Sequence, residues 1–328
     1  MARYTTQGLS LLLVLCALLS LSLGSTDIAV FQGLSDWLSG VDSLEAIVIG
    51  EIRLPRTLLA LSVGAALGLA GAALQALLRN PLADPGLTGA SQGAALGAAM
   101  VFYFGLLPAL GAAAVAIAGL LGAGLALAVM LLLAGSANAA MVIMAGLAIS
   151  TLTGALLATV LNFAPNPYAM QELVFWLLGS VSERGLEHLT FLVPALFIAG
   201  LLLFSQRKLL AALSLGDEVA QSLGFNVRKG ARVIVLSAAM LVGSSVAVAG
   251  SIGFVGLLVP HMVRPLVGHR PEKTLLPSAL AGASLVCLAD VLVRLLPVGR
   301  ELKLGVLTAL LGTPLFIYLV WRERKKWH

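Results

Sequence analysis

The stretch Thr57-Leu-Leu-Ala-Leu-Ser-Val-Gly-Ala-Ala-Leu-Gly-Leu-Ala-Gly-Ala-Ala-Leu-Gln-Ala-Leu-Leu78 decides the fold class. It contains no Asp, Glu, Lys or Arg, and it is long enough for one helical crossing of a bilayer, which takes about 20 apolar residues. Its apolar residues lack the two-residue alternation of a barrel strand. Because lipid offers the backbone no hydrogen bonds, a spanning segment of this kind pairs its own N–H and C=O groups as an α-helix. The stretch therefore predicts a transmembrane helix.

The rest of the chain repeats this pattern. Of its 328 residues, 59% are hydrophobic and 11% are charged, and the mean hydropathy is +1.02, whereas soluble domains are about half apolar and a quarter charged. Apolar runs predict about ten transmembrane helices, at 8–24, 57–78, 90–107, 110–134, 139–162, 190–204, 231–250, 256–267, 274–296 and 304–321. A further run, 169–181, is too short to cross and predicts a re-entrant half-helix. We expect an all-α integral membrane protein with a single transmembrane domain over residues 1–328.

The first apolar run follows Arg3 and ends before Gly24-Ser25, a pattern that imitates a secretory signal peptide. We interpret this run as a retained first helix. Cys16 within it, and Cys287 near the other end of the chain, both lie among apolar residues. That setting indicates core packing, and neither a disulfide nor a metal site.

The distribution of basic residues predicts the orientation. With the N-terminus in the cytoplasm and ten crossings, most of the 20 Lys and Arg residues fall on the cytoplasmic side, in agreement with the positive-inside rule. The basic residues expected outside are Arg53, Arg56, Arg184, Arg294, Arg300 and Lys303. Both termini are therefore expected in the cytoplasm. This topology accounts for the sequence pI near 9.5 without a nucleic-acid partner.

Glycine is abundant, with 35 residues, and several glycines are spaced four apart within the predicted helices. Gly64 and Gly68 form one such pair, and Gly93 and Gly97 form another. Small residues at this spacing let neighbouring helices approach closely. We expect a compact bundle whose helices touch at these glycines.

The sequence has no motif for catalysis or metal binding. It lacks a Gly-x4-Gly-Lys-Ser/Thr phosphate loop, and its histidines are scattered, with His261 beside Pro260 read as a structural residue. Uphill transport would then draw on an ion gradient or on a partner protein. The clearest acid inside a span is Asp290, and Arg294 lies one helical turn away, which predicts an i,i+4 ion pair and not a proton relay. A partner-driven transporter is therefore favoured, with an ion-gradient-driven secondary transporter as the alternative.

The longest cytoplasmic loop, about 207–232, is expected to form two short helices. Gly216 breaks the chain, Asp217 or Ser214 can cap a helix, and Gly224 can end it. Amphipathic turns that lie on a membrane surface suit docking into a partner's groove. An ordinary solvated loop is the alternative.

This loop resembles the coupling segment of the binding-protein-dependent ABC importer permeases for iron-siderophore complexes, haem and cobalamin (the FecCD-like family). The family pattern Leu-Gly-x-x-x-Ala-x-x-Leu-Gly is met by Leu215, Gly216, Ala220, Leu223 and Gly224. Four further stretches resemble the same family, and the likeness covers nearly the whole chain after residue 45: Arg53-Leu-Pro-Arg56, Gln75–Gly86, Gly250–Arg264 and Gly305–Phe316.

The resemblance implies a permease subunit in the bacterial inner membrane, surrounded by lipid. It would pair with a second copy, two cytoplasmic ATPase subunits and a periplasmic substrate-binding protein. ATP and magnesium would bind to the ATPase, and this chain would carry no catalytic residue, cofactor or metal. The implied ATPase-coupling residues are Leu215, Gly216, Asp217, Ala220, Leu223 and Gly224. The residues implied to dock the binding protein are Arg53, Arg56 and Arg294, and those implied to form the cytoplasmic gate are Asn80, Leu82, Ala139 and Ala140.

The favoured substrate is an iron chelate, a siderophore complex before haem, with cobalamin as the alternative. Where cobalamin importers of the family carry small hydroxyl residues before the fifth helix, this chain has Ala139 and Ala140, which disfavours cobalamin. The pathway residues that the resemblance identifies are apolar or small. Selection of the substrate would therefore fall mainly to the binding protein.

Overall fold

The computed structural model describes residues 2–24, 26–105, 110, 113–135, 139–163, 167–296 and 301–324. In these ranges the chain is helical and contains no strand. Its α-helices are α1 (Ala2–Ser22), α2 (Val30–Ser39), α3 (Leu44–Ile47), α4 (Leu54–Leu77), α5 (Ala90–Phe104), α6 (Ala113–Ala134), α7 (Ala139–Asn162), α8 (Pro167–Leu177), α9 (Leu189–Ser205), α10 (Arg207–Leu213), α11 (Asp217–Ser222), α12 (Val227–Ala249), α13 (Val255–Leu266), α14 (Pro271–Leu295) and α15 (Leu304–Arg324).

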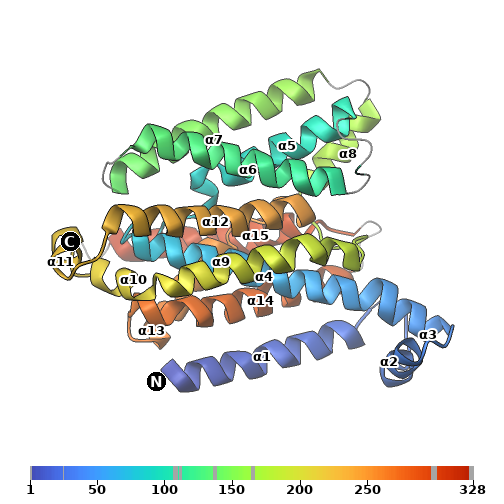
Figure 1. Ribbon diagram of the computed structural model, residues 1–328. Coiled ribbons are helices and arrows are strands. Elements are labelled where there is room, and N and C mark those ends of the chain that lie inside the picture. Colours follow the sequence, from blue (N-terminus) through green and yellow to red (C-terminus); the bar gives the residue numbers. More distant parts are fainter. Residues whose placement is uncertain are drawn as a thin grey trace.

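The long helices lie side by side in one bundle (Figure 1). Seven helical segments of the described chain are long and apolar enough to cross a membrane, and α5, α13 and the described part of α15 are shorter apolar helices. Together, the seven long segments and the three shorter helices correspond to the ten apolar runs predicted from the sequence. The predicted all-α membrane fold is confirmed, with boundaries that differ by a few residues.

Helix α4 lies deep in the bundle, because every residue from Ala66 to Ala76 is buried. Glycines of this helix lie in direct contact with the backbone of neighbouring helices. A Cβ atom added at Gly64 would lie 2.2 Å from the carbonyl oxygen of Gly282 in α14, and one added at Gly68 would lie 2.2 Å from that of Ser278. The expected close packing at Gly64 and Gly68 is confirmed.

A second glycine contact joins α5 to α6. A Cβ atom at Gly93 would lie 2.5 Å from the carbonyl oxygen of Gly122, and one at Gly97 would lie 2.1 Å from that of Ala118. Figure 1 shows α5, α6 and α7 together on one side of the bundle, next to α12. The four-residue glycine spacing in the sequence thus predicted this contact between α5 and α6 as well.

Three breaks in the helices meet inside the bundle. The chain leaves α8 at Gly179, leaves α12 at Gly250 and enters α15 near Gly305. The breaks pair with one another, since Ser180 N donates to Ala249 O at 2.7 Å and Gly305 N donates to Gly179 O at 3.2 Å. This pairing satisfies backbone groups that lipid would leave without partners. The predicted half-helix is α8, which has only 11 residues.

Between α1 and α4 the structure contains helices that were not predicted from the sequence. Helix α2 ends at Gly40, which has a left-handed φ of 69°, and the Ser43 side chain caps α3 by accepting from Ala46 N. A π-helical segment, η1 (Val48–Arg53), then runs into α4. Helix α2 was missed because its 10 residues include polar ones and are too few to span a membrane.

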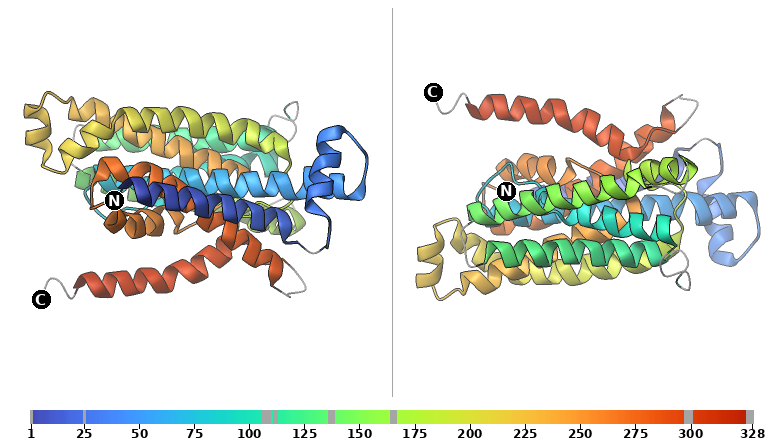
Figure 2. Two further views of the ribbon diagram at one scale, coloured as in Figure 1. Left: turned by 90° about the horizontal axis from the view of Figure 1, so that it is seen from below. Right: turned by 90° about the horizontal axis from the view of Figure 1, so that it is seen from above.

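The bundle has two distinct ends. Helix α1 begins and α15 ends at the end that carries α10 and α11, which we call the coupling end, and α2 and α3 lie at the opposite end (Figure 1). The predicted cytoplasmic location of both termini stays a prediction. The views in Figure 2 show α15 leaning away from the other helices toward its C-terminal end.

Candidate functional site

The predicted coupling segment consists of α10 and α11 at the coupling end of the bundle (Figure 1). Gly216 separates the two helices with a φ of 112°, and Gly224 follows α11 with a φ of 86°. Both values favour glycine, because side chains crowd the backbone at positive φ. The predicted capping by Asp217 or Ser214 is wrong, since α11 has no side-chain cap and begins at Asp217 itself.

Three apolar residues in and beside α11 face solvent, whereas those of α10 are mostly buried. Leu215, Val219 and Leu223 are 66%, 41% and 60% exposed, whereas Ala220 is fully buried. Ala220 thus packs α11 onto the bundle, and the larger apolar side chains point away from it. Exposed apolar side chains on a short helix are typical of a surface that a partner covers.

The loop after α4 contacts this segment. Arg79 Nη2 lies 2.8 Å from Asp217 Oδ1, and both side chains are partly exposed. Arg79 itself has a left-handed φ of 51°. The contact connects the Asn80–Leu82 turn to α11. It was not predicted, because 138 residues separate the two in sequence.

The predicted gate residues Asn80 and Leu82 lie in that turn. The Asn80 side-chain oxygen accepts a hydrogen bond from Leu82 N at 2.9 Å. Both residues line a cavity of about 60 Å³ together with Val142 of α7. Ala139 and Ala140 form the start of α7, and their side chains lie outside the described residues. The structure brings the turn and α7 together, and the gating role remains a prediction.

Asp84, for which the sequence predicted no role, lines the same cavity. Its Oδ1 accepts a hydrogen bond from Gly86 N at 2.6 Å. Burial raises the pKa of the Asp84 carboxyl group above its ordinary value, and the bond from Gly86 offsets part of that rise. The Asp-Pro-Gly sequence, which favours tight turns, was the signal that could have marked this residue.

Arg53, predicted to dock a binding protein, joins η1 to α1. It is only 3% exposed, and its guanidinium group donates to the carbonyl oxygens of Leu21 at 2.8 Å and Ser22 at 2.9 Å. The last carbonyl groups of a helix have no partner within the helix. Arg53 therefore satisfies the C-terminal end of α1.

Arg56 and Arg294, the other two predicted docking residues, belong to a buried charge cluster. Asp290 lies at its centre and is 1% exposed. Arg56 Nη2 is 2.9 Å from Asp290 Oδ1, and Arg294 Nη2 is 2.7 Å from Asp290 Oδ2. Arg56 also pairs with Glu301. The predicted Asp290–Arg294 ion pair is confirmed. All three arginines have intramolecular partners, and their docking role remains a prediction.

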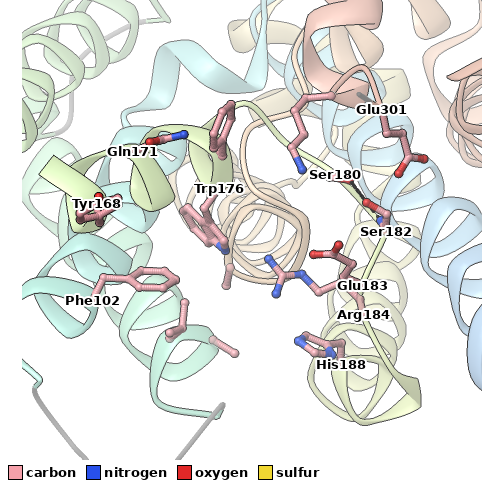
Figure 3. A pocket seen from close by; sticks show the side chains of 15 residues that line it. Phe102, Tyr168, Gln171, Trp176, Ser180, Ser182, Glu183, Arg184, His188 and Glu301 are labelled. Carbon is pink, nitrogen blue, oxygen red and sulfur yellow. Dashed lines mark hydrogen bonds between the residues drawn. The ribbon is translucent and has the colours of Figure 1, made fainter. Parts of the chain in front are cut away.

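At the end opposite the coupling end, the structure contains a cavity of about 920 Å³, which we call the vestibule. Its walls come from α5, α6, α8, α12, the loop between α8 and α9, and the segment before α15. An aromatic wall is contributed by Phe102, Tyr168, Phe175 and Trp176. Figure 3 shows Arg184 and His188 on the other side of the cavity, with Arg184 pointing toward Trp176. The vestibule is large enough for a sizeable organic ligand.

A bundle of this kind, with a vestibule at one end and short exposed helices at the other, defines a multi-pass membrane permease. The sequence profile of the FecCD transport family matches residues 12–322. The chain belongs to this family and is a permease of the ABC importer type.

Curated relatives agree with this assignment. The chain is 39% identical over 321 residues to the vitamin B12 import system permease protein BtuC of Salmonella typhi. The alignment covers 97% of this chain and 95% of that protein. It is 36% identical over 324 residues to the ABC transporter permease protein YvrB of Bacillus subtilis, with 95% and 92% covered. The family assignment favours a partner-driven transporter over a secondary transporter.

Solved structures share the fold. The inward-facing structure of a transporter described as of the metal-chelate ABC type superposes with a TM-score of 0.88 at 33% identity, covering 98% of this chain and 99% of that one. A chain of PsaBC from Streptococcus pneumoniae gives a TM-score of 0.59 at 18% identity, covering 87% and 94%. The second likeness concerns the fold alone.

Proposed function

We propose that this chain is the transmembrane subunit of a chelate importer in the bacterial inner membrane. Two copies would form the pathway, two cytoplasmic ATPase subunits would power it, and a periplasmic binding protein would deliver the substrate. The chain would hold no cofactor, since ATP and magnesium would bind to the ATPase. The coupling end would face the cytoplasm, with both termini, and the vestibule would face the periplasm.

The observation that carries this proposal is the exposed apolar surface formed by Leu215, Val219 and Leu223. In water such a surface is costly unless a partner covers it. Short helices beside the basic loop residues would lie in the cytoplasm under the positive-inside rule. A cytoplasmic ATPase is therefore the partner that we expect there.

The lean of α15 supports pairing with a second copy. This helix stands apart from the bundle (Figure 2), and Leu310, Leu311 and Ile317 are exposed along it. A second copy that packed against α15 would bury this surface. The pathway would then run between the two copies.

The substrate that we propose is an iron chelate, either a siderophore complex or haem. Cobalamin is the second candidate, and it is favoured by one specific observation, the 39% identity to permeases named for vitamin B12 import. Both classes are bulky metal chelates, which fits the size of the vestibule. The alanines at 139 and 140 remain the argument against cobalamin.

Assembly with an ATPase tests the proposed function. The purified chain alone should show no ATP hydrolysis, because it contains no phosphate loop. Co-expression with the ATPase encoded nearest to it should give a stable complex with vanadate-sensitive hydrolysis. An ATPase that never co-purifies with the chain, under conditions where both are folded, would contradict the proposal.

A further inference from the structure

The loop between α8 and α9 holds Arg184 in a fixed position at the vestibule. Ser180 N donates to Ala249 O at 2.7 Å, the hydroxyl groups of Ser180 and Ser182 are 2.7 Å apart, and Val181 is buried. Glu183 has a left-handed φ of 57°, an unfavourable conformation for a non-glycine residue. Such strain persists only where the surrounding structure imposes it. The loop is therefore a built feature that presents Arg184 to the cavity.

The guanidinium group of Arg184 is incompletely paired. Its Nε atom is buried and has no hydrogen-bond partner among the described residues, and within the same part of the chain Arg184 forms no salt bridge. Burial lowers the pKa of Arg184, and Glu183 only partly counteracts this shift. A buried donor without a partner is costly, which points to a ligand that completes it.

The remaining charges of the vestibule leave an excess of positive charge. The charged lining residues are Glu183, Arg184, Glu301 and Lys303, with His188 beside them. Glu301 is neutralised by its ion pair with Arg56. The remaining charged side chains of the lining are then Arg184 and Lys303, which are positive, and Glu183, which is negative. Among the described residues Lys303 has no salt-bridge partner. The net charge of the lining is positive before any charge on His188 is counted.

We propose that Arg184 and Lys303 form an anion-binding subsite in the vestibule, and that the transported chelate carries a carboxylate, catecholate or similar anionic group. This inference rests on the proposed function as a chelate permease. The aromatic wall opposite Arg184 would contact an apolar or flat face of the same ligand (Figure 3). The substrate class is therefore an anionic metal chelate with an apolar face, which favours a carboxylate-bearing porphyrin or an anionic iron complex over a neutral chelate.

The charge can be measured without transport, because Trp176 lines the cavity. Phenylalanine would replace the other tryptophans, Trp37, Trp321 and Trp327, and the protein would be studied in lipid nanodiscs at low salt. Quenching of Trp176 by iodide reports local positive charge, and quenching by neutral acrylamide reports accessibility. We expect Arg184→Gln to lower the iodide quenching constant about twofold and to leave acrylamide quenching unchanged. Arg184→Lys should retain the iodide value, and Lys208→Gln at the coupling end should change neither constant.

The ligand is tested in the assembled transporter with haem and its neutral dimethyl ester, and with an anionic ferric catecholate and a neutral ferric hydroxamate. We expect Arg184→Gln to reduce uptake of the transported anionic chelate about tenfold or more and to leave the amount of assembled transporter unchanged. Equal iodide quenching in the parent and Arg184→Gln proteins would overturn the inference, as would equal uptake of its anionic substrate by the two. Absence of ATP-driven uptake of every chelate by the parent would instead count against the proposed function, and the iodide result would still decide whether the anion subsite exists.

Discussion

Arg79 and Asp217 form an ion pair of 2.8 Å between the turn that follows α4 and the first residue of α11. The turn contains the predicted gate residues Asn80 and Leu82, and α11 carries the surface proposed to bind the ATPase. The pair is therefore a direct physical link between the two. Its side chains are 42% and 44% exposed, so its contribution to folding stability is expected to be only about 0.2–1 kcal/mol.

Breaking this link should affect coupling more than folding. We expect Asp217→Asn and Arg79→Gln to leave the amount of folded complex unchanged while the number of chelates transported per ATP falls. The double variant with exchanged charges, Arg79→Asp with Asp217→Arg, should recover part of the loss. Transport and hydrolysis measured on the same proteoliposomes give this ratio, and an unchanged ratio in both single variants would rule out the linking role.

The exposed apolar surface of α11 is tested by Leu223→Asp. If this surface docks into an apolar groove, the unpaired charge should weaken association with the ATPase by several kcal/mol, on the order of 3–5. Ser222→Asp is the matched control, because it adds the same charge at the neighbouring exposed position. Co-purification stoichiometry is the measurement. Normal assembly of Leu223→Asp would mean that the segment is an ordinary solvated loop.

The buried charge cluster predicts a large stability effect at Asp290. Asp290→Ala leaves Arg56 and Arg294 without their shared partner, and removing one member of a buried ion pair costs about 3–5 kcal/mol. Glu301→Gln alters the exposed edge of the same cluster, and should cost only about 0–1 kcal/mol. Thermal unfolding of the purified proteins compares the two variants. Similar midpoints for Asp290→Ala and the parent would show that the cluster is not structural.

The close contact of α4 with α14 at Gly64 predicts that an added side chain would clash there, whereas an added side chain at Gly124 would not. Alanine at Gly64 places its Cβ atom 2.2 Å from a backbone oxygen of α14, whereas a Cβ atom at Gly124 in α6 meets nothing within 4 Å. We expect Gly64→Ala to destabilise the protein by about 1–3 kcal/mol and Gly124→Ala to be neutral or stabilising. Equal unfolding midpoints for the two variants would contradict the close α4–α14 contact.

The docking role of Arg53, Arg56 and Arg294 still requires its own measurement. We expect Arg56→Glu to weaken binding of the periplasmic protein and to make the remaining affinity less sensitive to salt, since like charges would face each other. Because Arg56 also pairs with Asp290, only the folded fraction should be compared. Arg207→Glu, at the coupling end, controls for a general change of charge. Unchanged low-salt affinity of the Glu variants at all three positions would leave these arginines with a structural role alone.

Much of the fold was predictable from the sequence, because a membrane span has a strong local signal. Length and apolarity placed the seven long helical segments and the three shorter apolar helices, and the four-residue spacing of Gly64 and Gly68 predicted their contact with another helix. Helix α2 gave no such signal, since it is short and partly polar. Its apolar positions, Phe31 and Leu38 among them, follow helical spacing, but this pattern is weak over 10 residues.

The contacts within the candidate sites were harder to predict, because they join distant parts of the chain. Asp290 and Arg294 were predictable as a pair, since they lie one helical turn apart. Arg56 was not predictable as the third member, because its approach to Asp290 depends on how α4 packs on α14. The same holds for Arg184, whose direction is set by a loop anchored to the end of α12. The residue types indicated which side chains were candidates for the sites, and the tertiary structure was needed to identify the residues with which they interact.

The most direct test of the proposed function is chelate accumulation by proteoliposomes that contain the permease, its ATPase and ATP, with the binding protein on the side of the vestibule. We expect accumulation that requires ATP, stops with vanadate and disappears when the ATPase is omitted. Accumulation of the chelate by the permease alone, driven by a proton or sodium gradient, would contradict it.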